Sequence, residues 1–88
     1  MIKLTHVEPS GPQRLSLAFS DGSYGEWSSG DLLKTKTVLT QPLTDEAYFA
    51  RAFISFGALA WPNGLELSAG SLHEELADSG KLNSAAAA

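Results

Sequence analysis

The segment Trp61-Pro62-Asn63-Gly64 separates an apolar run of strand character from a run of helical character. Pro62 fixes its own φ and lacks an N–H, whereas Asn63 and Gly64 are of the residue types that most readily adopt positive φ. The segment therefore predicts a tight turn that holds the large Trp61 side chain at the edge of a small core. It carries no catalytic or ligand motif, so it constrains the fold rather than the chemistry.

The length of 88 residues predicts one domain, which we place at residues 1–80, followed by a disordered tail at 81–88. The chain has no cysteine, which excludes disulfides and thiolate metal sites. No stretch approaches the roughly 18 apolar residues that would cross a membrane, and the N-terminus does not resemble a signal peptide. We therefore expect a cytoplasmic protein without membrane contact.

The charge balance is acidic, with ten Asp and Glu against six Lys and Arg and a formal net charge of −4. Binding to a nucleic-acid duplex needs clustered cations that displace counterions from phosphates, and the basic residues are scattered along the chain. Nucleic-acid binding by this chain alone is disfavoured. The acidity suits a basic partner instead.

The first third of the chain has the pattern of a three-stranded antiparallel meander. Residues 2–8 predict a first strand, and the cluster Pro9-Ser10-Gly11-Pro12 predicts a loop after it. In residues 14–19, apolar and small or polar side chains alternate with a period of two, which is typical of a half-buried strand. Asp21-Gly22 then indicates a hairpin turn, and residues 24–27 form the return strand.

The middle of the chain is less regular. Ser28 and Ser29 can cap a short helical turn at residues 30–33. Residues 35–42 are compatible with an extended connection or with a short strand. Thr44 is a suitable N-cap for a helix over residues 45–51, on which Tyr48 and Phe49 cannot both face the core.

The last third predicts a hairpin followed by a helix. Residues 53–56 and 58–61 read as two short strands hinged at Gly57 and, being apolar on both faces, as covered on both sides. The helix spans about residues 69–77 with Ser68 as N-cap, although the pair Ser71 and Glu74 also has capping-box spacing. Gly80 stops it. The whole is an α+β domain, with one antiparallel sheet of about five strands and two or three short helices.

This pattern resembles a family of small bacterial proteins labelled only as a domain of unknown function. The resemblance rests on Phe19-Ser20-Asp21-Gly22 and on the W-P-N-G-x-x-L segment from Trp61 to Leu67, and it covers roughly residues 2–78. It implies a compact α+β domain. Some relatives carry an added helix-turn-helix, for which too few residues follow Gly80. Others are encoded beside a second small protein, which has suggested a toxin–antitoxin pair.

Motifs that carry chemistry are absent from the sequence. His6 and His73 are the only histidines, and no spacing such as H-E-x-x-H accompanies them, so we expect no metal and no cofactor. The serines cluster at turns and caps, and no nucleophile elbow or phosphate-binding glycine loop occurs. We expect no catalytic residues, and enzyme activity is disfavoured.

The residues that stand out have a structural or an interaction role. Trp61 belongs either to the core or to a partner-binding patch, because Trp and Tyr bury large areas at low entropic cost. The full candidate set is Asp21, Gly22, Trp27, Trp61, Pro62, Asn63, Gly64 and Leu67.

The leading hypothesis is a non-enzymatic module that binds another protein, in its specific form the antitoxin-like or accessory half of a two-protein system. Association of two copies through an open sheet edge is a further form of partnership. The alternative is a small-molecule-binding or enzymatic domain with a pocket near Trp61. A DNA-binding regulator ranks last.

Overall fold

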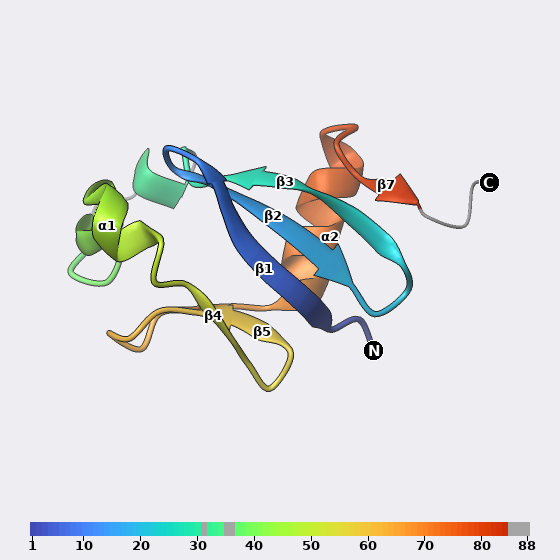
Figure 1. Cartoon of the computed structure of the whole chain (residues 1–88), viewed down its shortest axis with the longest axis horizontal. Helices are drawn as coiled ribbons and strands as arrows, with labels where there is room; N and C mark the ends of the chain where they lie inside the picture. The colour runs from blue at the N-terminus through green and yellow to red at the C-terminus, as the bar shows by residue number, and fades with distance from the viewer. Residues whose placement is uncertain (31, 35–36, 85–88) are drawn as a thin grey trace.

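The computed structural model describes residues 1–30, 32–34 and 37–84. It begins with the predicted meander, in which β1 (Leu4–Gly11), β2 (Arg14–Phe19) and β3 (Ser23–Ser28) pair antiparallel in chain order (Figure 1). The period of two in β2 is confirmed, because Leu15, Leu17 and Phe19 are buried on one face. The opposite face of β3 is exposed at alternate positions.

The predicted loop at Pro9–Pro12 is wrong for most of its length, because β1 continues to Gly11. Pro9 lies opposite Leu15 of β2, with irregularities of the register on both sides of it. β1 is an edge strand of its sheet, where a residue without an N–H is tolerated. The chain reverses only at the next two residues, and Gln13 adopts a φ of 58°.

The expected disordered tail is also wrong for residues 81–84. Asn83 and Ser84 form β7, a fourth strand that pairs with β3, and Leu82 packs partly buried against the core. Gly25 permits this arrangement: a Cβ at that position would lie 2.7 Å from the Lys81 carbonyl oxygen, so a larger residue would push the segment away. Residues 85–88 lie outside the described part of the chain.

The segment between the two sheets contains short helices: 3₁₀ helices η1 (Leu32–Lys34) and η2 (Gln41–Thr44), then α1 (Glu46–Phe49). Residues 38–40 form a turn, so neither the extended connection nor the short strand forms there; positions 35 and 36 lie outside the described residues. The helix expected over 45–51 is shorter, and Arg51 lies beyond its end.

The predicted N-cap of α1 differs from the observed one. Asp45, not Thr44, caps α1, because the Asp45 side chain accepts a hydrogen bond from the Ala47 N–H, whereas the Thr44 hydroxyl donates to the Gln41 carbonyl. Of the two serines predicted to cap the turn at residues 30–33, the Ser28 hydroxyl accepts a hydrogen bond from the Gly30 N–H, whereas the Ser29 hydroxyl donates across to the Gln13 side chain. The helical turn expected at residues 30–33 includes position 31, which lies outside the described residues.

A second sheet replaces the single sheet of about five strands that we expected. It contains β4 (Phe53–Ser55), β5 (Ala58–Ala60) and β6 (Glu66–Leu67), paired antiparallel in that order. The predicted hairpin with its reversal at Gly57 is confirmed, and β6 is an added strand. The expectation that the hairpin is covered on both faces is wrong, since Phe53 is 44% and Phe56 102% exposed.

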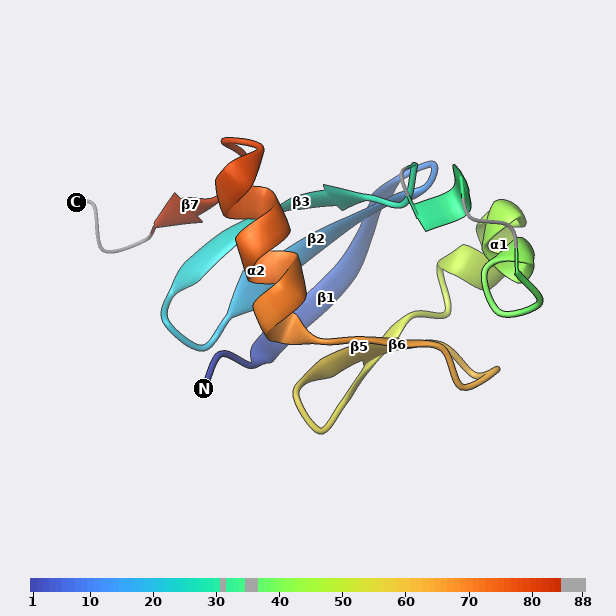
Figure 2. The ribbon, with the colours of Figure 1, turned by 180° about the vertical axis from the view of Figure 1, so that it is seen from behind.

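The long helix α2 (Ala69–Asp78) follows β6 and crosses the meander on its inner face (Figure 2). Its predicted cap is confirmed, because the Ser68 side chain accepts a hydrogen bond from the Ser71 N–H. Leu72 and Leu76, four residues apart, are both buried. The helix ends just before Gly80, whose φ of 74° suits glycine.

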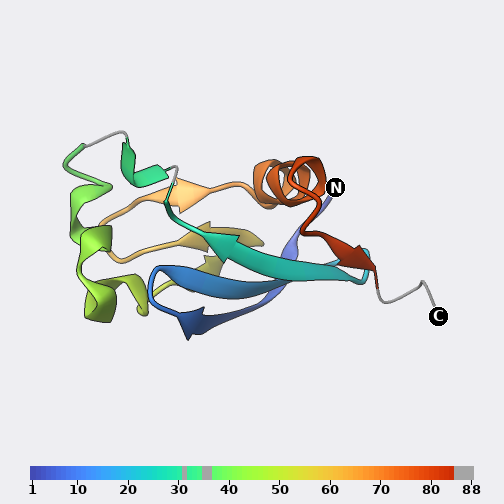
Figure 3. The same ribbon diagram turned by 90° about the horizontal axis from the view of Figure 1, so that it is seen from above.

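One core joins all of these elements. The view from above shows α1 and the 3₁₀ helices at one end of the molecule and α2 toward the other, with the strands between them (Figure 3). The two sheets are connected directly where the Leu4 N–H of β1 donates to the Gly57 carbonyl, at 2.8 Å. The buried cluster contains Leu4, Leu15, Leu17, Phe19, Trp27, Leu43, Phe49, Leu59, Trp61, Ala69, Leu72 and Leu76.

Candidate functional site

The Trp61-Pro62-Asn63-Gly64 segment forms the turn that its composition predicts. The Gly64 N–H donates to the Trp61 carbonyl at 3.0 Å, and the Trp61 N–H donates to the Leu65 carbonyl at 3.0 Å. Gly64 has a φ of 95°. Asn63, in contrast, does not use its tolerance of positive φ, since Gln13 and Phe56 are the non-glycine residues that have one in the described chain.

Asn63 has a different role, which is to connect three segments. Its N–H donates to the Tyr48 hydroxyl at 2.9 Å, and its Nδ2 donates to the Leu39 carbonyl at 3.0 Å. Its Oδ1 accepts a hydrogen bond from the Leu65 N–H at 3.2 Å. These hydrogen bonds attach the turn to α1 and to the segment before η2. The role of Asn63 is therefore structural.

The two tryptophans of the candidate set lie in the core. Trp27 is 2% and Trp61 1% exposed, and both rings contact Phe49 of α1, with ring centroids 6.4 and 5.9 Å from the Phe49 centroid. The Trp61 Nε1–H donates to the Phe49 carbonyl at 3.1 Å, so its polar atom is satisfied inside. Leu67 lies in β6, partly buried against the same cluster. The two tryptophan side chains therefore offer almost no surface to a partner.

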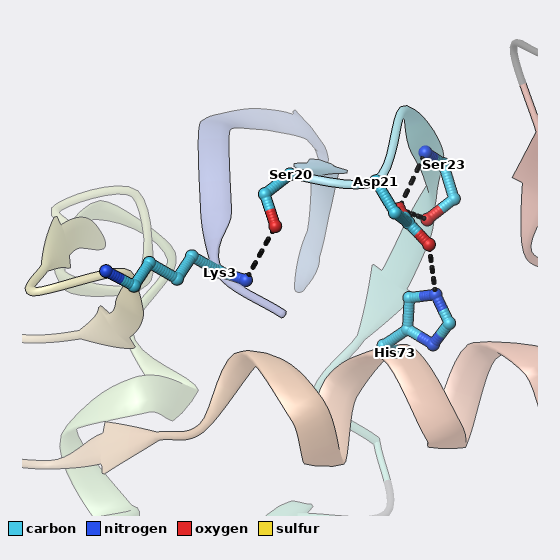
Figure 4. A network of polar contacts seen from close by, with 5 residues as sticks. All are labelled: Lys3, Ser20, Asp21, Ser23 and His73. Carbon is cyan, nitrogen blue, oxygen red and sulfur yellow. Dashed lines mark hydrogen bonds and ion pairs between the residues drawn. The ribbon is translucent and has the colours of Figure 1, made fainter. Parts of the chain in front are cut away.

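Asp21 and Gly22 form the reversal between β2 and β3, where Gly22 has a φ of 89°. Asp21 Oδ1 accepts hydrogen bonds from the N–H and the hydroxyl of Ser23, and Asp21 Oδ2 lies 3.0 Å from Nε2 of His73 on α2 (Figure 4). The bonds from Ser23, followed by the His73 contact, lower the pKa of Asp21 from 3.8 to about 2. The turn is thereby fastened to the helix.

This Ser–Asp–His grouping does not have the geometry of nucleophilic catalysis. The Ser23 hydroxyl donates to the carboxylate of Asp21 rather than to an imidazole, so no base activates it. Ser20 next to it accepts a hydrogen bond from the Lys3 N–H and thus supports the same turn (Figure 4). His6 is paired with Glu8 on β1, away from His73. The residues that the structure describes contain no group of three or more potential metal ligands.

The exposed apolar residues of the β4–β5 hairpin were not among the candidates. Phe56 lies at the tip of the hairpin, fully exposed, with a φ of 49°. Phe53 lies at the start of β4 and is 44% exposed. A signal for this was available in the sequence: a two-residue reversal at Phe56-Gly57 favours positive φ at both residues, which forces the aromatic ring out of the sheet.

The fold and these contacts define a small α+β domain whose most distinctive sequence motifs are turns. The chain belongs to the family described as "Protein of unknown function (DUF2442)", whose model matches residues 4–77. This confirms the resemblance to an uncharacterised family. No curated protein matches the chain, and no solved structure matches it.

The helices of the described residues are all short. The longest is α2 with ten residues, about half the length that a bilayer requires, and none is long and apolar enough to cross.

Proposed function

We propose that this chain is a non-enzymatic module that binds another protein, as the antitoxin-like or accessory half of a bacterial two-protein system in the cytoplasm. The observation that carries the proposal is Phe56, an aromatic residue that is fully exposed and held at positive φ. Both features are unfavourable in the isolated domain, because an L-residue with a Cβ is strained in the left-handed region and the ring is left in water.

Backbone strain of this kind concentrates at functional positions, where a binding event uses the geometry that the strain maintains. Phe56 and the half-exposed Phe53 belong to one hairpin, so two aromatic side chains can engage one partner. Aromatic residues are enriched among those that dominate the binding energy of protein interfaces. The hairpin tip is therefore the surface on which we place the partner.

The alternative of a ligand pocket near Trp61 has less support. The Trp61 ring is enclosed by Trp27 and Phe49, and its N–H is used inside the protein. Pairing of two copies through β1 also has less support, because this edge strand contains Pro9 and two register irregularities, which are devices that hinder strand addition. DNA binding remains disfavoured by the net charge of −4.

The test compares proteins captured from the native cell extract by the tagged wild-type chain and by Phe56→Asn. Asparagine tolerates positive φ, so the variant retains the hairpin while losing the ring. We expect one companion at about equal stoichiometry with wild type and its loss with Phe56→Asn. Fractionation of the same cells tests the cytoplasmic location.

A matched control is Val38→Asn, which replaces another exposed apolar side chain, 86% exposed, in a different segment. This variant should retain the companion. Capture of no companion by the wild-type chain, or equal capture by Phe56→Asn, would contradict the proposal.

A further inference from the structure

A groove runs between α2 and the elements that precede it. Its lining comes from β3, η1, β6 and the first two turns of α2, and its volume is about 500 Å³. In the view from above, β6 leads into α2, and β3 runs below both of them in the picture (Figure 3). This hollow lies apart from the turn contacts of Asp21 and Asn63, and Phe56 is not among its lining residues.

The groove combines apolar walls with two carboxylates. The apolar part of the lining comes from the partly buried Leu32 and Leu67, with the buried Leu72 and Trp27 behind them. Glu66 and Glu75 supply the charges, and both residues are exposed.

The two carboxylates differ in how they are held. Oε2 of Glu75 accepts a hydrogen bond from the Trp27 Nε1–H at 2.6 Å, which fixes the carboxylate over the groove. Within the described residues Oε1 of Glu75 has no hydrogen-bond partner, and the Glu66 side chain has neither a hydrogen bond nor an ion pair. The groove therefore presents two hydrogen-bond acceptors: the Glu75 carboxylate, which is held in place by Trp27, and the Glu66 carboxylate, which is free to reorient.

Among the residues that the structure describes, no Lys or Arg lines the groove, and the surroundings are acidic. Between Arg51 and Lys81 the sequence has no Lys or Arg, and it has four carboxylates. Two of these, Glu74 and Asp78, border the adjoining face of α2. A cationic occupant would meet negative charge on the rim of the groove and on the helix beside it, while Lys81 lines a separate hollow on the other side of Glu75.

We infer that this groove binds an arginine- or lysine-bearing segment of a basic protein partner. The aliphatic stem of such a side chain lies against Leu32 and Leu67, and its cationic head reaches Glu66 and Oε1 of Glu75. Long basic side chains combine an apolar stem with a charged end, and the planar guanidinium of arginine matches a carboxylate with two donors. The inference concerns a second surface and does not depend on Phe56.

The two tryptophans provide an internal comparison for the test. The indole N–H of Trp27 is bonded to Glu75 in the groove, whereas that of Trp61 is bonded to a backbone carbonyl in the core. The probe is the peptide acetyl-Arg-Leu-Arg-Leu-Arg-amide, titrated into the ¹⁵N-labelled full chain. We expect a saturable shift of the Trp27 indole signal and an unchanged Trp61 signal. The peptide with glutamate in place of arginine should shift neither.

Charge-matched variants locate the binding. Glu66→Gln should weaken binding of the arginine peptide about threefold to fivefold, the upper part of the range expected for loss of one exposed ion pair. Glu46→Gln removes the same charge from α1, outside the groove, and should leave the affinity unchanged. An unmoved Trp27 signal, or equal weakening by the two variants, would overturn the inference.

The outcomes also separate this inference from the proposed function. Peptide binding in the groove without a captured companion would contradict the proposed function alone. A companion that depends on Phe56, together with an unmoved Trp27 signal, would contradict the groove alone.

Discussion

Phe56 has a backbone conformation that aromatic residues rarely adopt, with a φ of 49° and a ring that is 102% exposed. Because the ring makes little contact within the domain, its removal costs little, whereas the strain of the left-handed region is roughly 1–2 kcal/mol. We therefore predict that Phe56→Asn raises the free energy of unfolding by about 1 kcal/mol. Urea denaturation measures the change.

Val38→Asn is the control for this prediction, because Val38 is also exposed and has no positive φ. Its free energy of unfolding should change by less than about 0.5 kcal/mol. A decrease of stability in Phe56→Asn would mean that the ring has contacts that offset the strain.

At the residue scale, the sequence predicts where the turns lie better than it predicts which contacts the turn residues make. The W-P-N-G turn is predictable because Pro62 and Gly64 impose local backbone geometry. The role of Asn63 is not, since its partners Leu39 and Tyr48 lie 24 and 15 residues away and meet it only in the folded chain. Asp21 illustrates the same limit, because its bonds to Ser23 are local and its contact with His73 spans 52 residues.

At the scale of elements, the Asp21 carboxylate connects the β2–β3 turn to α2 in a pH-dependent way. Its pKa is about 2 in the folded protein, below the ordinary value of 3.8. A lowered folded-state pKa means that the charged form stabilises the fold. This contribution is complete above pH about 4 and is lost as the pH falls toward 2.

The measurement is urea denaturation of wild type and Asp21→Asn between pH 2 and pH 7. We expect wild type to be more stable at neutral pH and the difference to close between pH 4 and pH 2. Asp45→Asn, at the exposed cap of α1, is the comparison for a carboxylate that has no contact with α2. A difference that stays constant down to pH 2 would contradict the role of the charge.

Elements with a long periodic pattern were predictable, and elements of two residues were not. β2 buries every second residue and α2 buries residues four apart, so local spacing identifies both. β6 and β7 have two residues each and exist because β5 and β3 lie beside them. The cap of α1 shows a related limit, since Thr44 and Asp45 are both good caps and only the preceding 3₁₀ helix decides between them.

At the scale of the whole molecule, the two sheets share one hydrophobic cluster. Trp27 of the first sheet and Trp61 beside the second lie with their ring centroids 6.4 Å apart, next to Phe49. Because one cluster serves both sheets, neither can lose its packing alone, and we expect a single cooperative unfolding transition.

Two variants with one tryptophan each test this cooperativity. In Trp61→Phe the fluorescence reports on Trp27 and the first sheet, and in Trp27→Phe it reports on Trp61 and the second. For each variant, the fluorescence midpoint and the far-ultraviolet circular dichroism midpoint in urea should coincide, although both variants should be less stable than wild type by about 1–3 kcal/mol. Separate midpoints within one variant would show that the sheets unfold independently.

The pairing of β7 with β3 has a consequence for the order in which a ribosome releases this chain. β1, β2 and β3 are synthesised first and can pair with one another, whereas the segment that covers β3 over Gly25 comes more than fifty residues later. For several seconds of translation the nascent meander therefore has an open strand edge, which any other extended chain can occupy. Until residues 83 and 84 leave the ribosome, Ser23 and Tyr24 at this edge lack their pairing partners within the chain.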